Sequence, residues 1–222
     1  MFDRIVERYD FLNRFLSLRR DVAWRKHVAR MLPEGEALRF LDLATGTGDL
    51  LLATLEERPG AAYVVGLDMA EKMLSRCKEK LTRRDASDAA KVVRGDAAVV
   101  PARDESFDAV TMAFGIRNMP DVKAALRETR RVLKPGGLLL ILEFSMPRKP
   151  FRWVYLFYLR HILPRVAGCI SGNNAAYEYL NRTIEDFPFG EAFCRLMHEA
   201  GYRNISARPQ TFGIATIYRG ER

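Results

Sequence analysis

Three aspartates stand at the ends of three successive apolar segments of this 222-residue chain, and each segment has the pattern of a short strand. The acids are Asp42 in "LRFLDLA" (38–44), Asp68 in "AYVVGLD" (62–68) and Asp96 in "KVVRGD" (91–96). A single aspartate after a strand is more often a helix cap or turn former than a ligand. Three such acids favour a binding site, because the carboxyl ends of parallel strands meet at one edge of a sheet.

A glycine-rich turn, "DLATGTGD" (42–49), follows the first of these segments, and turns of this kind often cradle phosphates. A P-loop is excluded because no Gly-Lys-Ser/Thr follows. A dinucleotide fingerprint is only weakly matched, because Leu51 stands where the third glycine of G-x-G-x-x-G belongs. Gly46 and Gly48 can also serve simply to allow a positive φ.

The acids indicate a ligand with a ribose and an adenine but no phosphate. The Asp42 carboxylate would repel a pyrophosphate, whereas it would tolerate a cationic ligand or its amino group. Asp68 follows Gly48 by 20 residues, at the place where a carboxylate accepts hydrogen bonds from ribose hydroxyls. Asp96 is placed to accept from an adenine amino group. These features favour S-adenosylmethionine as the cofactor and methyl transfer as the activity.

Strands and helices alternate along the first two thirds of the chain, which predicts a doubly wound, mostly parallel α/β sheet. The expected strands are 38–44, 62–68, 91–96, 107–114 and 138–144, and the expected helices are 21–32, 48–57, 69–82 and 120–133. Met69, Met73, Cys77 and Leu81 are expected on one buried helix face, and Lys134 to Gly137 are expected to stop the helix before the fifth strand.

The pattern changes after Pro150. Helical segments are expected at 151–164, 172–184 and 189–201, and residues 203–220 close the chain as two antiparallel strands. We expect a single domain over 1–222. Its parts are an N-terminal helical cap (1–34), a cofactor-binding core (35–150), a helical substrate-side segment (151–201) and C-terminal antiparallel strands (202–222).

Charge and composition narrow the class of protein. The 36 Lys and Arg residues against 28 Asp and Glu residues give a net charge of +8, which suits nucleic acid, an anionic membrane surface or an ordinary basic protein. The three cysteines and three histidines are scattered, so neither a disulfide framework nor a metal site is expected. No stretch reaches the ~18 apolar residues of a membrane span, and no leader is recognisable, which predicts a cytoplasmic protein.

Longer motifs extend over nearly the whole chain. They are "YDFLNRFLSLRRDVAWRK" (9–26), "LDLATGTGDL" (41–50), "GLDMAEKML" (66–74), "FGIRNMPD" (114–121), "RVLKPGGLLLILEFS" (131–145) and "LPRVAGCISGNNAAYEYL" (163–180). Together they resemble the C-methyltransferases of ubiquinone and menaquinone biosynthesis, the demethylmenaquinone methyltransferase family. The glycine turn alone is shared by many methyltransferases, whereas the motifs at 114–121 and 131–145 are more specific.

The resemblance implies a class I S-adenosylmethionine-dependent methyltransferase fold. This is a Rossmann-like, mostly parallel seven-stranded sheet with an antiparallel last strand, N-terminal helices and a helical insertion after the fifth strand. It also implies that Thr47, Asp68, Asp96 and Ala97 contact S-adenosylmethionine and that Ala113 lies beside it. With the turn and its neighbours, the candidate cofactor-binding residues are Asp42, Gly46, Thr47, Gly48, Asp68, Met69, Asp96, Ala97 and Ala113.

The chain departs from the family pattern near its N-terminus. The family motif reads Y-D-x-M-N and later S-x-x-x-H-x-x-W, but here Leu12 replaces the Met and Asp21 stands at the His position. The positions that still match are Tyr9, Asp10, Asn13, Ser17 and Trp24. If that histidine helps to bind the substrate, this chain binds it differently or prefers another quinol.

The resemblance further implies methylation of a ring carbon of a polyprenylated quinol, at the demethylmenaquinol step or at the methoxy-polyprenyl-benzoquinol step of ubiquinone synthesis. A ring carbon becomes nucleophilic when its neighbouring hydroxyl loses a proton, and a phenol of pKa ~10 needs help to do so. Arg117 is the candidate phenolate-stabilising cation, and a surface salt bridge with an acid such as Asp121 is its alternative role. Asn118 is expected to orient the ring hydroxyl. Tyr9 either bonds quinol or cofactor, or belongs to the core.

The region after the fifth strand is expected to meet the rest of the substrate. Ser171, Asn173, Asn174 and Tyr177 are candidate polar groups over the ring. The aromatic segment 151–164 either lines an apolar opening for the isoprenoid tail or forms a lid helix. Arg148, Lys149, Arg152, Arg160 and Arg165 surround it, with the aromatic side chains Trp153, Tyr155 and Phe157. They suggest a transient contact with an anionic membrane surface, unless the arginines form a solvated face and the aromatics belong to the core.

Other functions stay open at this point. A methyltransferase for RNA or another small molecule is the main alternative, but "AFGIRN" (113–118) occupies the slot of a D/N-P-P-Y motif, and no cysteine follows a proline. No nucleic-acid partner is therefore expected. A non-catalytic quinone- or lipid-binding protein is disfavoured by Asp68 and Asp96. The sequence does not decide between benzoquinol and naphthoquinol, nor between a monomer and a homodimer, nor does it identify the proton acceptor.

Overall fold

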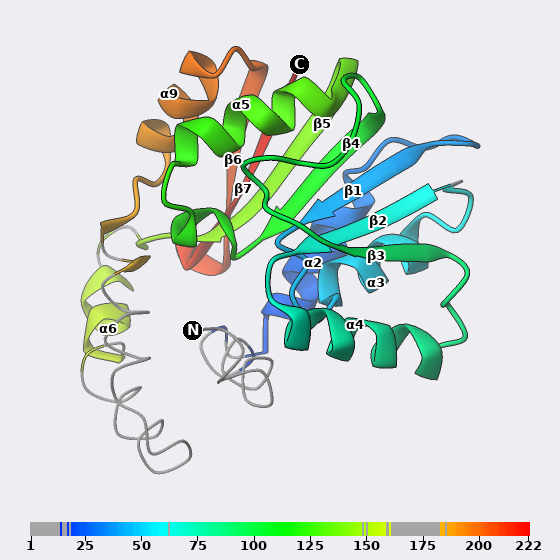
Figure 1. Cartoon of the computed structure of the whole chain (residues 1–222). Coiled ribbons are helices and arrows are strands. Elements are labelled where there is room, and N and C mark those ends of the chain that lie inside the picture. The colour runs from blue at the N-terminus through cyan, green and yellow to red at the C-terminus, as the bar shows by residue number, and fades with distance from the viewer. Residues whose placement is uncertain are drawn as a thin grey trace.

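The computed structural model describes residues 14, 17, 19–61, 63–147, 149, 151–158, 160, 183–184 and 186–222. Within them one sheet has the strand order β3-β2-β1-β4-β5-β7-β6 (Figure 1). The strands are β1 Arg39–Leu43, β2 Tyr63–Asp68, β3 Ala90–Arg94, β4 Phe107–Ala113, β5 Leu133–Phe144, β6 Arg203–Gln210 and β7 Ala215–Glu221. Strands β1 to β5 pair in parallel, and β7 runs antiparallel to both β5 and β6, which confirms the predicted class I methyltransferase architecture.

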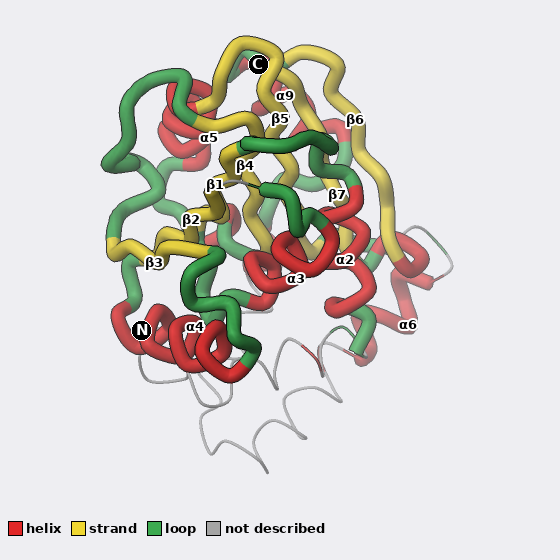
Figure 2. Tube along the Cα trace, turned by 90° about the vertical axis from the view of Figure 1, so that its right-hand side faces the viewer, coloured by secondary structure: helices red, strands yellow, loops and turns green. Residues whose placement is uncertain are grey.

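Helices cover both faces of this sheet, as a doubly wound fold requires. The α-helices are α2 Asp21–Arg30, α3 Asp49–Glu57, α4 Glu71–Arg83, α5 Val122–Val132, α6 Phe151–Phe157 and α9 Glu191–Glu199. Figures 1 and 2 show α2, α3 and α4 on one face and α5 and α9 on the other. Tyr155 of α6 joins the apolar cluster that contains Trp24 of α2.

Strand β5 shows how the apolar run 138–144 supports two cores. Leu140 and Leu142 point into the cluster that holds Leu51, whereas Leu139 and Ile141 point into the opposite cluster. Because side chains of a strand alternate between its faces, a strand that is covered on both sides is apolar at nearly every position, and Glu143 is the buried exception in this run. The continuous apolar character of 138–144 therefore predicted its burial correctly.

The strand order creates a switch point beside β1. The chain moves from β1 to β2 and β3 on one side, and then returns to place β4 on the other side of β1. Leu41 accordingly pairs with Val65 of β2 and with Val110 of β4. In open α/β sheets, ligands bind in the crevice at the carboxyl ends of the strands at such a point.

Two local predictions were wrong. Residues Lys134 to Gly137 lie inside β5, which begins at Leu133 directly after α5, because Leu133 already pairs with Phe107 before the register shifts. Met69 precedes α4 and is 62 % exposed, whereas the residues predicted to share its face, Met73, Cys77 and Leu81, are buried.

The C-terminal strands pair antiparallel, as predicted, across a short 3₁₀ turn, η4 Thr211–Gly213. Most of the predicted helix 172–184 and the first part of the N-terminal cap lie outside the described residues. Among the helices that the structure describes, none combines the length and the apolar character needed to cross a membrane.

Candidate active site

The glycine turn between β1 and α3 owes its shape to two positive φ angles. Gly46 has φ +55° and Gly48 has φ +82°. A Cβ at Gly48 would collide with the Sγ of Cys77 on α4, so this glycine lets α3 and α4 approach each other. A Cβ at Gly46 would meet no atom within 4 Å, so the space above Gly46 is open to a ligand.

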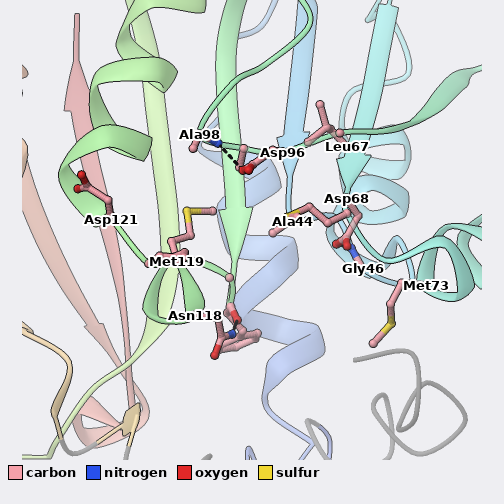
Figure 3. A pocket seen from close by; sticks show the side chains of 16 residues that line it. Ala44, Gly46, Leu67, Asp68, Met73, Asp96, Ala98, Asn118, Met119 and Asp121 are labelled. Atoms are coloured by element: carbon pink, nitrogen blue, oxygen red, sulfur yellow. Dashed lines mark hydrogen bonds between the residues drawn. The ribbon is translucent and has the colours of Figure 1, made fainter. Parts of the chain in front are cut away.

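A cavity of about 320 Å³ opens at the carboxyl ends of β1, β2, β3 and β4, at the switch point. Its lining includes the predicted cofactor-site residues Gly46, Asp68, Met69, Asp96 and Ala97, and the predicted catalytic residue Asn118. Figure 3 shows Gly46 and Asp68 facing Asn118 and Met119 across this space. The strand-end argument therefore brought Asp68 and Asp96 to one cavity, as expected.

Backbone amides hold the two acids of this cavity in place. Asp68 accepts from Gly46 N through Oδ2 and from Ala70 N through Oδ1, both at 2.8 Å. Asp96 Oδ1 accepts from Ala98 N, also at 2.8 Å. These contacts orient the carboxylate of each acid.

A smaller hollow of about 20 Å³ lies on the other side of Gly46 and holds the remaining predicted cofactor residues except Gly48. Asp42, Thr47 and Ala113 line it. Asp42 is buried and accepts from Thr45 Oγ1 at 2.6 Å and from Thr111 Oγ1 at 2.8 Å. Burial raises the pKa of Asp42 to about 6, although these two hydrogen bonds and the charge of Arg25 oppose the shift.

Charged side chains fix the turn from outside the hollow. Lys80 Nζ of α4 donates to Thr47 Oγ1 at 2.8 Å and to Asp49 Oδ1 at 2.6 Å. Burial by itself would raise the pKa of Asp49, but Arg25 and Lys80 together lower it. The predicted cofactor contact of Thr47 would therefore be made from a hydroxyl that Lys80 already positions.

Asp21, at the position where the family motif has histidine, forms a buried ion pair with Arg25. Asp21 also accepts from Ser17 Oγ at 2.9 Å. The Arg25 guanidinium lines the small hollow and lies 5.2 Å from the centroid of the Phe114 ring, a cation–π distance. Asp21 thus pairs with Arg25, whose guanidinium lines the same hollow as Asp42.

Arg117 does not line the large cavity, and its ion-pair partner is not Asp121. Its side chain is 3 % exposed, and Nη1 donates to Glu143 Oε1 at 2.5 Å and to Phe114 O at 2.9 Å. Its guanidinium lies 5.3 Å from the centroid of the Phe144 ring. The suggested surface salt bridge with Asp121 is therefore wrong, because Asp121 caps α5 through Ala124 N and Glu143 is the partner.

Glu143 is a buried acid that the sequence analysis did not include in the site. It ends the apolar run of β5 and is fully buried. Burial raises the pKa of Glu143, against the opposing charge of Arg117. The sequence did contain a signal, because a glutamate stands inside the apolar run "LLLILEF" (138–144). A charged residue in a buried strand almost always has a charged or hydrogen-bonding partner, so its partner could have been sought.

Other predicted residues cannot be placed. Tyr9, Ser171, Asn173, Asn174 and Tyr177 lie outside the described residues, so their roles stay predictions. The cavity lining that the sequence reasoning missed is mostly apolar or glycine: Ala44, Leu67, Met73, Gly95, Ala98, Phe114, Gly115, Met119 and Pro120, together with Asp121. These residue types carry no chemical signal, and only the fold brings them together.

Comparison with known proteins decides the family. A model of the ubiE/COQ5 methyltransferase family matches residues 1–222, which is the whole chain. The chain belongs to the ubiE/COQ5 methyltransferase family. It is 45 % identical to a demethylmenaquinone methyltransferase of Thermus thermophilus, over 100 % of both chains. It is 42 % identical to the ubiquinone/menaquinone biosynthesis C-methyltransferase UbiE of Geobacter sulfurreducens, over 100 % of this chain and 87 % of the relative.

A solved structure supports the fold independently of the family. An S-adenosylmethionine-dependent methyltransferase of Thermotoga maritima superposes with a TM-score of 0.67 at 21 % identity, over 99 % of this chain and 97 % of that one. Family membership confirms the predicted enzyme class, a methyltransferase. The family and the shared fold also support S-adenosylmethionine as the cofactor, as the strand-end acids predicted.

Proposed function

We propose that this chain transfers a methyl group from S-adenosylmethionine to a ring carbon of a polyprenylated quinol. The large cavity supports S-adenosylmethionine as the methyl donor, because Asp68 and Asp96 line it together with Gly46, above which the space is open. The names of the full-length relatives carry the acceptor half. The Thermus relative is named for demethylmenaquinone alone, and this favours a naphthoquinol acceptor.

The residues present fit S-adenosylmethionine. The lining of the cavity is mainly apolar, with carboxylates at two strand ends, which suits an adenosine whose ribose hydroxyls and amino group donate to acids. In our proposal Asp68 holds the ribose, Asp96 with Ala97 holds the adenine, and Asp42 faces the amino group from the small hollow. When bound, S-adenosylmethionine supplies an electrophilic methyl group.

The chain's own residues then prepare the acceptor. A guanidinium is a poor base and a good cation, so Arg117 acts as a stabiliser of the ring oxygen. Its ion pair with Glu143 and its contact with the Phe144 ring fix the guanidinium in one orientation. Asn118, which lines the cavity, orients the ring hydroxyl in this proposal. The apolar walls exclude water, which strengthens each of these interactions.

The oxidation state of the acceptor tests this function. A quinone carbon is electrophilic and has no hydroxyl to deprotonate, so only the reduced acceptor should take the methyl group. Labelled S-adenosylmethionine is incubated with demethylmenaquinol and with a methoxy-polyprenyl-benzoquinol, each with and without dithionite. Label transfer that requires reduction supports the proposal, and equal transfer to the oxidised acceptors contradicts it.

We also propose that the chain meets its lipid-soluble acceptor at an anionic membrane surface. Phe151, Trp153 and Phe157 of α6 are exposed, and the Phe151 ring stacks on that of Phe212 at 4.4 Å between centroids. Trp153 and Phe212 are each 68 % exposed. Aromatic side chains at this level of exposure favour the interface between headgroups and acyl chains.

Basic residues accompany this apolar patch. Lys149, Arg152 and Arg160 are exposed beside it, whereas Arg148 and Arg165 lie outside the described residues. Each basic side chain near an anionic surface contributes about 1 kcal/mol, and the attraction falls off within a Debye length. The expectation that Tyr155 also dips into the headgroups is wrong, because Tyr155 is buried.

Sedimentation with vesicles tests the membrane proposal. Binding should rise with anionic lipid, fall at high salt and weaken when Arg148, Lys149 and Arg152 are changed to Gln. The matched control changes Arg103, Arg127 and Arg195 to Gln; these three are exposed, and none of them lies near α6 in the chain. Equal binding to neutral and anionic vesicles, or an equal loss in the control, would contradict the electrostatic part.

A further inference from the structure

Two deeply buried polar groups near the large cavity have no hydrogen-bond partner among the described residues. They are the hydroxyl of Tyr155, whose residue is 6 % exposed, and Nε of Arg117, whose side chain is 3 % exposed. A buried donor without a partner costs free energy, so native proteins rarely keep one without a reason. One such reason is a ligand that supplies the missing acceptor.

The two groups lie on different elements, and the charge of Arg117 influences the Tyr155 phenol. Tyr155 lies on α6 and Arg117 on the 3₁₀ turn η2 Ile116–Asn118, after β4. Burial raises the pKa of Tyr155, as does Tyr158, and the charge of Arg117 lowers it, so the phenol lies within electrostatic reach of the guanidinium. Since the net shift is upward, Tyr155 keeps its proton and remains a donor at neutral pH.

Packed aromatic rings connect both groups to the wall of the cavity. Phe114 lines the cavity and stacks on Phe144, with the ring centroids 4.4 Å apart. Arg117 covers the Phe144 ring, and Tyr155 belongs to the apolar cluster that contains Phe114 and Phe144. Asn118, next to Arg117, reaches the cavity itself.

The available donors suit one oxygen that carries negative charge. Nη1 of Arg117 already donates to Glu143 and to Phe114 O, whereas Nε–H can donate to a ligand. A phenol hydroxyl beside it adds a second donor. Hydrogen bonds to a charged oxygen are roughly twice as strong as neutral ones, so such a pair favours a phenolate over the neutral phenol.

We propose that Tyr155 belongs to the acceptor site and donates its hydroxyl hydrogen bond, beside Arg117 Nε–H, to the ring oxygen that becomes negative during methyl transfer. This rests on the proposed function. The ring O–H proton leaves to water, the bond from ring carbon to methyl forms as the bond from sulfur to methyl breaks, and the proton displaced from that carbon also leaves to water while the ring oxygen takes one back. Tyr155 neither gains nor loses a proton, so its part needs no further reactant.

The test removes only the hydroxyl, in Tyr155→Phe. The kcat with reduced acceptor should fall about ten- to a hundredfold, with cofactor affinity unchanged by calorimetry. The pH–rate profile should move alkaline, because the phenolate has lost a donor. The midpoint of thermal unfolding should not fall, since the hydroxyl has no partner among the described residues to lose.

The matched control is Tyr202→Phe. Tyr202 is equally buried, but its hydroxyl is 2.8 Å from Thr129 Oγ1 and 3.3 Å from Leu126 O, away from the site. This variant should lose stability and keep its turnover and pH profile. Full turnover with an unshifted pH–rate profile in Tyr155→Phe, or a loss of stability like that of Tyr202→Phe, would overturn the role of Tyr155. If the wild-type enzyme is active in the same assay, the proposed function still stands. A wild-type enzyme inactive on every reduced quinone would overturn both.

Discussion

The buried ion pair between Arg117 and Glu143 allows stability and catalysis to be separated. Changing Arg117 to Met removes the cation and leaves Glu143 as an uncompensated charge inside the protein. We expect this variant to be strongly destabilised near neutral pH. We also expect the double variant Arg117→Met/Glu143→Gln to regain most of the stability, because it has no buried charge left at this place.

The size of the expected loss of unfolding free energy follows from the burial of the Arg117–Glu143 pair. Exposed ion pairs contribute about 0–1 kcal/mol, but these side chains are only 3 % and 0 % exposed. Removing one partner of such a pair costs about 3–5 kcal/mol. The sign of the pH dependence is fixed by Glu143, whose folded pKa is raised from 4.5 by burial and should rise further without Arg117. Protonated Glu143 stabilises the fold fully below its unfolded pKa, and this stabilisation is lost as the pH rises through the folded pKa. The variant should therefore lose less free energy of unfolding at about pH 5 than at about pH 8.

Urea unfolding of the wild type, both single variants and the double variant measures these terms. Methyl transfer is measured on the same samples under conditions where each is folded. We expect the double variant to be folded yet slower by orders of magnitude, since the phenolate has lost its cation. A single Arg117→Met variant as stable as the wild type at about pH 8, or a fully active double variant, would refute the reasoning.

Three further predictions follow from the cavity and the turn. Asp68→Asn should weaken the binding of S-adenosylmethionine, measured by calorimetry, at least ~tenfold, because charge-assisted hydrogen bonds contribute ~1.5–3 kcal/mol each. The control Asp104→Asn, in an exposed loop, should leave the affinity unchanged. Equal affinities of the two variants would exclude Asp68 from the site. Burial raises the pKa of Asp42 from 3.8 to about 6, so protonated Asp42 stabilises the fold fully below about pH 4, and this stabilisation is lost as the pH rises through about 6. The free energy of unfolding of the wild type should therefore decline by an amount on the order of 3 kcal/mol over this range, and that of Asp42→Asn should not. Parallel curves of unfolding free energy against pH would contradict this. Gly48→Ala should lower the unfolding free energy by more than ~1 kcal/mol, through its positive φ and the collision with Cys77, and an unchanged urea midpoint would count against that packing.

Sequence reasoning succeeded where position along a strand determines position in space. Asp68 ends β2 and Asp96 lies two residues after the neighbouring parallel strand β3, so the alternation of strands and helices was enough to bring both to one cavity. It failed for Arg25 and Glu143, whose places depend on how α2 and β5 pack against the switch point. A basic residue on an amphipathic helix and a single acid in an apolar strand each have many more common explanations than a site.

Arg117 was predicted to be the phenolate-stabilising cation, and this role stays a prediction, but the alternative ion pair with Asp121 was wrong. Nothing in "FGIRNMPD" (114–121) specifies whether the guanidinium points to the near Asp121 or to Glu143 on a strand that follows α5. The burial of Arg117 over the Phe144 ring decides this, and it arises from the pairing of β4 with β5. Local sequence could therefore predict the residue and not its partner.

The most direct test of the central claim is the position of the transferred methyl group. Reduced demethylmenaquinone is incubated with the protein and S-adenosylmethionine carrying a deuterated methyl group, and the product is reoxidised in air and analysed by mass spectrometry and absorbance. Methylation at carbon leaves both ring hydroxyls in place, so the account predicts that the labelled product reoxidises fully to a methylated quinone. A labelled product that cannot be reoxidised would carry the methyl group on oxygen and would contradict the account, as would the absence of any labelled product.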